Sequence, residues 1–136
     1  MLRRICIYLT MSMLCMFMTG CGTKEETTGK IRDLDFTVVA TQNIPEELLE
    51  VLESEKADVF HKTYSDGDYM YLCVGYGEQE TGGYSITVNE LYLTNDSIYM
   101  DTTLVGPSPE ETPADSCSYP YIVICTEYME CPIIFE

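Results

Sequence analysis

The most informative segment of this 136-residue chain is Tyr69-Met70-Tyr71-Leu72-Cys73-Val74. Every side chain in it is apolar or aromatic, so both faces of an extended chain would be apolar here. A strand that is apolar on both faces is typical of the centre of a sheet. The Asp-Gly pair within residues 65–68, just before this segment, is a strong hairpin signal. We therefore expect residues 60–64 and 69–76 to form a central β-hairpin.

Further strands are expected on both sides of this hairpin. Residues 84–88 alternate apolar and polar side chains, and the apolar positions then shift to Leu91 and Leu93, which predicts a β-bulge near residues 89–90. An Asn-Asp turn leads into the next strand, and Pro120 suits the beginning of the last one. The expected strands beyond the hairpin cover residues 34–40, 84–93, 98–104 and 119–125.

One amphipathic helix is predicted at about residues 45–56. A proline stands near its first position, and Glu46 and Glu47 occupy the first turn, where negative charge is favourable. The apolar side chains fall on one helical face, and the glutamates lie on the other. The expected fold class is α+β: a mostly antiparallel sheet of about six strands with this one helix packed on it. We expect a single domain at residues 33–136.

Composition excludes several classes of protein. The chain has 23 acidic and 7 basic side chains and a formal net charge of −16. Binding to nucleic acid requires clustered Lys and Arg, so no nucleic-acid partner is expected. Electrostatic docking on anionic lipid is excluded for the same reason. The hydrophobic content of 46% is too high for a disordered chain.

The N-terminus is typical of an exported protein. A basic start at residues 1–4 precedes a largely apolar run at residues 5–18, which is shorter than the ~20 residues of a membrane-spanning helix. The sequence Met18-Thr19-Gly20-Cys21 resembles the lipobox of bacterial lipoproteins. That resemblance implies a signal peptide at residues 1–20 and a diacylglycerol on Cys21. Two acyl chains would anchor the protein to the extracytoplasmic face of the bacterial cell membrane.

Residues 21–32 are then a polar tether between the lipid and the domain. Two alternatives stay open for this N-terminus, ordinary secretion and an uncleaved membrane anchor.

Four of the seven cysteines fall within the expected domain. Two of the others lie in the signal peptide and one is Cys21. An even number in an exported domain permits two disulfides with three connectivities, although free buried thiols are an equally acceptable interpretation. A zinc site fits poorly, because the chain has one histidine and no C-x-x-C pair here. The four candidates are Cys73, Cys117, Cys125 and Cys131.

Several sequence elements in fixed order resemble the PrcB C-terminal domain. They are Gly75-Tyr76-Gly77, Thr81-Gly82-Gly83-Tyr84-Ser85-Ile86, a hairpin at residues 91–104, a proline-rich loop, and Tyr119-Pro120-Tyr121-Ile122-Val123. The likeness extends over about residues 68–127. It implies a small bacterial lipoprotein or secreted protein. The family takes its name from a subunit of a surface protease complex, which implies a role in stability or assembly rather than in catalysis.

No catalytic or metal-binding pattern stands out. His61 is the only histidine, and no Gly-x-Ser-x-Gly motif is present. The glycine-rich residues 75–83 lack the lysine and the following helix that hold a phosphate. The acidic pairs at residues 66–68 and 110–111 lack the spacing of a calcium loop. We therefore expect no catalytic residues, no metal and no cofactor, and no enzymatic activity.

We expect instead a lipid-anchored, non-enzymatic interaction module, an accessory or stabilising subunit of a surface protease complex or a partner of another envelope protein. Two alternatives are a protease inhibitor acting through residues 78–83 and 106–115, and a lipoprotein that binds envelope components or a small ligand. The two glycines before Tyr84 are expected to serve the backbone, through positive φ or close approach. The candidate interaction loop or ledge consists of Thr81, Gly82, Gly83, Tyr84, Tyr119, Pro120 and Tyr121.

Overall fold

A computed structural model describes residues 29–136. The predicted signal peptide at residues 1–20, the predicted lipid site at Cys21 and most of the predicted tether at residues 21–32 lie outside the described residues. No helix within residues 29–136 is both long enough and apolar enough to cross a membrane.

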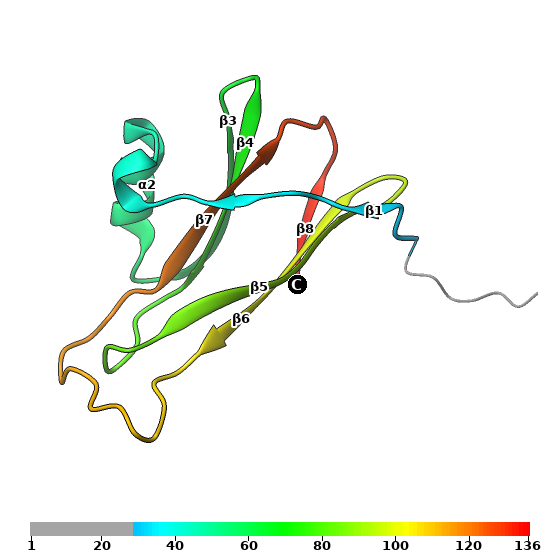
Figure 1. Cartoon of the computed structure of the whole chain (residues 1–136). Helices are drawn as coiled ribbons and strands as arrows, with labels where there is room; N and C mark the ends of the chain where they lie inside the picture. Colours follow the sequence, from blue (N-terminus) through cyan, green and yellow to red (C-terminus); the bar gives the residue numbers. More distant parts are fainter. Residues whose placement is uncertain (1–28) are drawn as a thin grey trace, which may run out of the picture.

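The described chain forms two four-stranded sheets (Figure 1). The first, called the β4–β7 sheet, has the order β2-β7-β4-β3, and the second, called the β5–β6 sheet, has the order β1-β5-β6-β8. All strand pairs are antiparallel except β6 and β8, which are parallel. The strands are β1 (Arg32–Asp33), β2 (Thr37–Val38), β3 (Val59–Ser65), β4 (Tyr69–Tyr76), β5 (Ser85–Leu93), β6 (Ile98–Val105), β7 (Tyr121–Glu127) and β8 (Ile133–Phe135).

The expectation of one sheet of about six strands is wrong, because eight strands form two sheets that pack face to face. The physical reason lies in β4, whose two faces both have to be buried. A single sheet covered by one helix would leave Leu72 and its neighbours on β4 exposed to water. The β5–β6 sheet covers that face, and its own apolar side chains, such as Leu91 and Met100, are buried there in return.

The two faces of β4 belong to two separate apolar clusters. Met70, Leu72 and Val74 face the β5–β6 sheet in the core of the sandwich. Cys73 faces the opposite side, where it packs with Leu48 and Leu52 of helix α2 (Glu46–Glu55). The molecule thus has three layers, with α2 on the outer face of the β4–β7 sheet (Figure 1).

The predicted strand at residues 34–40 is divided between the two sheets. Leu34 N donates to Leu91 O at 2.9 Å in one sheet, and Val39 N donates to Val123 O at 2.9 Å in the other. The side chain of Leu34 is buried in the sandwich core at the crossing. A single turn of 3₁₀ helix (Thr41–Asn43) then leads to α2.

The local predictions for the helix, the central hairpin and the bulge are confirmed. Helix α2 covers residues 46–55, and β3 pairs with β4 in the expected antiparallel register. In the turn between them, Asp66 Oδ1 accepts hydrogen bonds from the backbone N–H groups of Asp68 and Tyr69 at 3.0 and 2.8 Å. The β5–β6 register shifts between Val88 and Glu90, at the predicted bulge.

We predict that Leu72→Ala lowers the free energy of unfolding by about 2–5 kcal/mol, because Leu72 is 0% exposed and the truncation leaves a cavity between the sheets. The control is Thr87→Val on the exposed side of β5, which should change stability by less than about 0.5 kcal/mol. Denaturant unfolding of both variants gives the two values. A loss below about 1 kcal/mol for Leu72→Ala would contradict the two-sheet core.

Candidate interaction surface

Two loops lie side by side at one end of the sandwich, and we call them the paired loops: residues 77–84 between β4 and β5, and residues 106–120 between β6 and β7 (Figure 1). Gln79 and Ser118 exchange two backbone hydrogen bonds, of 2.8 and 3.0 Å. Ser118 Oγ also donates to Thr81 O at 2.6 Å, and Gly82 N donates to Ala114 O at 3.2 Å. These four bonds join loops that are far apart in the sequence.

Glycine is required where the two loops approach most closely. Gly83 has a φ of +85°, and a Cβ at this position would lie 2.9 Å from Pro107 Cβ. Gly82 has neither property, because a Cβ there would lie 3.5 Å from Ala114 Cβ, an ordinary contact. Tyr84 lies against Gly106 on the same side of the loops. The expectation of positive φ or close approach therefore holds for Gly83.

The seven residues of the predicted ledge divide into two groups. Thr81, Gly82, Gly83 and Tyr84 contact the second loop, as described above. Tyr121 instead packs under α2, where its hydroxyl donates to Glu53 Oε1 at 3.1 Å. Tyr119 lies beneath the ammonium group of Lys56 on the same side, and Pro120 O accepts a hydrogen bond from Tyr76 N. Their role in binding stays a prediction.

Electrostatics link the second group to the helix. Lys56 Nζ lies 2.7 Å from Glu53 Oε2, and this ion pair, together with the Tyr121 hydroxyl, lowers the pKa of Glu53. Burial and the same carboxylate raise the pKa of Tyr121. This cluster holds the beginning of β7, and hence the end of the second loop, against α2.

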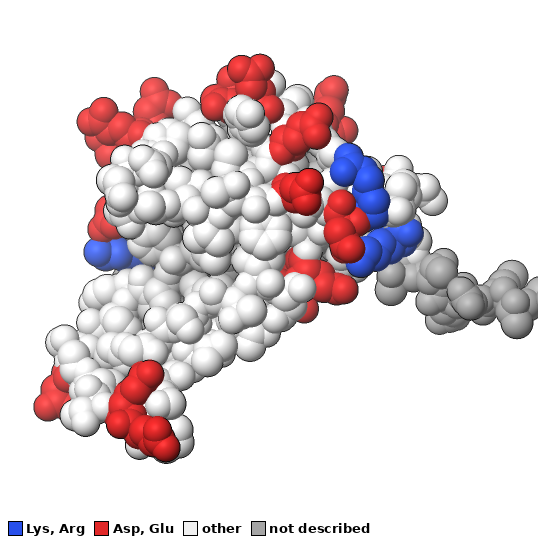
Figure 2. Space-filling model, in the orientation of Figure 1, with Lys and Arg blue, Asp and Glu red and all other residues white. Residues whose placement is uncertain are grey.

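The surface is acidic around its margin and uncharged at the centre of the face in Figure 2. Within residues 29–136, the three lysines all form ion pairs with carboxylates. Lys30 pairs with Asp33, Lys56 with Glu53 and Lys62 with Glu55. Most of the acidic side chains are therefore left without a cation, and the surface is complementary to a basic or an uncharged partner.

All four cysteines of the domain are free thiols in this structure. Cys73 is buried beneath α2, and burial raises the pKa of its thiol to about 12. Cys117 is exposed in the second loop, where a hydrogen bond to the Glu78 carboxylate raises its thiol pKa. Burial also raises the pKa values of Cys125 and Cys131. Disulfide pairing among the four stays a prediction.

The only histidine packs against an aromatic ring. The ring of His61 stacks on that of Phe135, with centroids 4.6 Å apart and planes at 11°. This contact joins β3 to β8 and closes the gap between the two sheets at that point. Within the part of the chain that the structure describes, no three His, Cys, Asp or Glu side chains come together in a metal-binding group.

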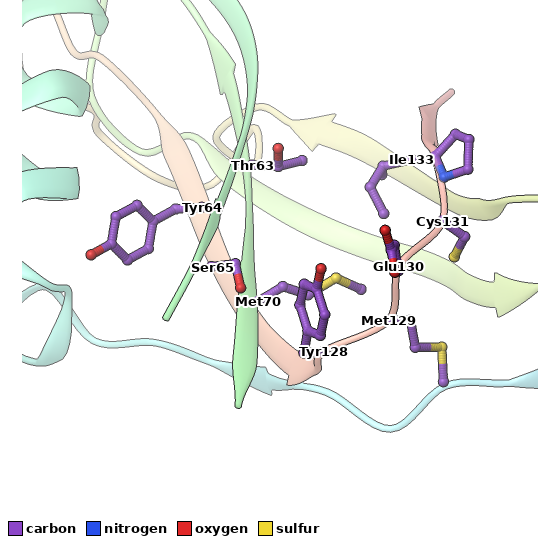
Figure 3. A pocket seen from close by; sticks show the side chains of 10 residues that line it. Thr63, Tyr64, Ser65, Met70, Tyr128, Met129, Glu130, Cys131 and Ile133 are labelled. Atoms are coloured by element: carbon purple, nitrogen blue, oxygen red, sulfur yellow. The ribbon is translucent and has the colours of Figure 1, made fainter. Parts of the chain in front are cut away.

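A groove that the sequence did not predict lies between the β3–β4 hairpin and the segment that joins β7 to β8. Its volume is about 440 Å³, and Figure 3 shows the side chains around it. The signal that was available is the largely apolar stretch at residues 128–133, which Glu130 interrupts. The lining residues are Thr63, Tyr64, Ser65, Met70, Tyr128, Met129, Glu130, Cys131, Pro132 and Ile133.

A family model described as PrcB C-terminal matches residues 70–127 of this chain, which confirms the family resemblance that the sequence indicates. The matched segment begins in β4, contains both of the paired loops and ends with β7. No curated protein and no solved structure matches the chain.

We predict that Gly83→Ala destabilises the protein by about 1–3 kcal/mol, because alanine disfavours the positive φ and collides with Pro107. Gly82→Ala is the matched control and should change stability by less than about 0.5 kcal/mol. Thermal and denaturant unfolding measure both. Equal effects of the two substitutions would show that the loops do not meet as described.

Thiol reactivity supplies a second prediction for this region. At pH 8, N-ethylmaleimide should modify the exposed Cys117 in the native protein, while Cys73 stays protonated and inaccessible until the protein unfolds. Peptide mapping by mass spectrometry, with and without urea, follows each site. Rapid native modification of Cys73 would contradict its burial beneath α2.

Proposed function

Because residues 70–127 match the PrcB C-terminal family, we propose that this protein is a lipid-anchored, extracytoplasmic interaction module that supports a surface protease complex. The proposed role is that of an accessory or stabilising subunit. The paired loops form its binding surface in this proposal, and the diacylglycerol on Cys21 holds it at the membrane.

The observation that carries the proposal is the location of the paired loops within the matched segment. Binding residues are frequently found on loops that a rigid scaffold positions. The hydrogen bonds between Gln79 and Ser118, and the contact of Gly83 with Pro107, fix the two loops before any partner arrives. A preordered surface loses less conformational entropy on binding, which favours affinity.

A non-enzymatic role fits the chemistry of the domain. The PrcB C-terminal family is not a known catalytic family. His61 contributes its ring to a stack with Phe135. The burial of Cys73 keeps its thiol protonated at neutral pH, which makes it a poor nucleophile.

The membrane anchor is tested by Cys21→Ser. This substitution removes the sulfur that carries the lipid, so the protein should leave the membrane fraction and lose the mass of the acyl groups. Cell fractionation and intact-mass measurement give the two readouts, and Cys117→Ser is the control that should stay in the membrane. Retention of the Cys21→Ser variant at an unchanged mass would count against lipidation.

The binding surface is tested by photo-crosslinking in the cells that produce the protein. A photoreactive residue in place of Glu80 or Glu110 reports from the paired loops, and one in place of the exposed Asn95, in the turn between β5 and β6, reports from the opposite end of those strands. We expect a surface protease or its precursor to be captured from the loop positions and not from residue 95. Equal capture from all three positions would refute the assignment of the surface.

An activity assay of the captured protease distinguishes a role in assembly from inhibition. An accessory subunit should leave the activity of its partner unchanged or should increase its yield. Loss of proteolytic activity on addition of the purified protein would favour the inhibitor alternative.

A further inference from the structure

Strand β3 forms a long edge of the β4–β7 sheet, and within residues 29–136 no further strand pairs with its outer side. The strands at the other three sheet edges, β1, β2 and β8, have two or three residues, whereas β3 has seven. Proteins usually blunt an edge with short strands, proline, bulges or charge, because free N–H and C=O groups can pair with another chain. Strand β3 contains no proline, and its pairing with β4 is regular throughout. Its one charged side chain, Lys62, forms an ion pair with Glu55.

The backbone groups that face outward on β3 can be identified from the ladder. Asp66 N donates to Tyr69 O across the hairpin turn. In an antiparallel ladder, hydrogen-bonded pairs recur at every second residue. Tyr64, Lys62 and Phe60 therefore bond to β4. The bond from Tyr76 N to Pro120 O fits this pattern, because it shows that the backbone N–H and C=O groups of the even-numbered residues of β4 point toward β7 and away from β3.

The N–H and C=O groups of Val59, His61, Thr63 and Ser65 consequently point away from the sheet. No other backbone bond to these four residues is present within residues 29–136. This edge offers alternate donors and acceptors over its full length.

Two of these four residues, Thr63 and Ser65, have side chains that line the groove, whereas the ring of His61 stacks on Phe135. Thr63 and Ser65 pair across the hairpin with Leu72 and Met70, so they share the face that the sandwich core occupies. The β5–β6 sheet does not cover them, and Val59 is 69% exposed. Thr63 and Ser65 line the groove together with Met129, Cys131 and Ile133 on its far side (Figure 3).

Charge restricts what can occupy this edge. Glu130 lines the groove, and Asp66 stands at the turn beside Ser65. On the helix side of β3, the Glu47 carboxylate accepts a hydrogen bond from the Tyr64 hydroxyl, and Glu55 lies 2.8 Å from Lys62. A second copy of this chain would bring the same acids and a net charge of −16, so like charges would oppose self-pairing.

We propose that β3 binds an extended basic segment of a partner protein by adding it to the sheet as a strand. Aliphatic side chains at alternate positions enter the groove, and the Lys or Arg side chains between them face the carboxylates beside β3. Main-chain hydrogen bonds supply affinity and the alternate side chains supply specificity in this mode of recognition. The inference goes beyond the proposed function, because β3 lies outside the matched residues. Its groove-lining residues, Thr63 and Ser65, are at the end of the strand opposite Val59, which is the end that adjoins the paired loops at Gly77.

The test uses the full-length protein in detergent and a fluorescein-labelled peptide, Lys-Val-Lys-Val-Lys-Val-Lys, with binding followed by fluorescence anisotropy. Two control peptides replace every Lys by Glu or every Val by Gly. We expect saturable binding of the first peptide and at least about tenfold weaker binding of both controls. Equal binding of the Lys-Gly peptide would show attraction to acidic surface alone and would overturn the proposal.

Thr63→Pro is the decisive variant. The N–H of Thr63 points outward, so proline leaves the ladder with β4 intact while it removes a donor and obstructs the edge. Affinity should fall about tenfold or more, and Thr63→Val, which keeps the N–H, should retain it. Where circular dichroism shows that Thr63→Pro does not fold, Thr63→Lys replaces it and should weaken binding through steric and charge repulsion.

Three results would contradict the proposal. They are a change below about twofold for the folded edge variant, no binding at about 1 mM peptide, and a dimer of the wild type that Thr63→Pro abolishes in sedimentation. The last result would assign the edge to a second copy of this chain. Because the variants are at Thr63, near the end of β3 that lies away from the paired loops, failure here leaves the proposed accessory role standing.

Discussion

The burial of both faces of β4 is the constraint from which the rest of the structure follows. A strand that is apolar on both sides needs two covers, and this small domain supplies them from different elements. Helix α2 covers the side that carries Cys73, and the β5–β6 sheet covers the side that carries Leu72. The order of layers and the burial of Leu34, where the chain crosses between the sheets, follow from that division.

The same constraint explains why a groove and a free strand edge lie at β3. The β5–β6 sheet covers β4 and β7, and it reaches β3 through the stack of Phe135 on His61. Thr63 and Ser65 line an open groove beside this stack. An exposed groove and an unpaired strand edge result. At the opposite end the chain passes from one sheet to the other, and the paired loops are stabilised by each other rather than by a core. Two surfaces with different properties thus arise from one packing arrangement.

Sequence reasoning succeeded where the signal was local. The Asp-Gly turn, the spacing of Leu48 and Leu52, and the shift of apolar parity before Leu91 each belong to a short window, and each feature is present in the structure. The two-sheet arrangement was not predicted, because alternation shows which side of a strand is apolar but not which element covers it. Strand β8 was also missed, since three residues that pair in parallel with β6 carry no period of their own.

For the candidate surfaces too, the sequence predicted local features but not the contacts between distant segments. The pair Gly82-Gly83 signals a backbone role in the sequence, yet only the structure shows that Gly83 alone has a positive φ and meets Pro107. Tyr84 and Tyr121 each stand near the beginning of a predicted strand, but they lie against different partners because one precedes β5 and the other begins β7. The groove beside β3 depends on residues more than sixty positions apart, which no local pattern connects.

The most direct test of this account is residue-resolved amide hydrogen exchange measured by NMR on the native protein. Exchange is slow for amides in a stable ladder and fast for amides that face water. The account predicts that the β4 amides exchange slowest, and that in β3 those of Lys62 and Tyr64 are protected while those of His61 and Thr63 exchange rapidly. Equal protection of all four β3 amides, or an unprotected β4, would contradict a doubly buried central strand with a free edge beside it.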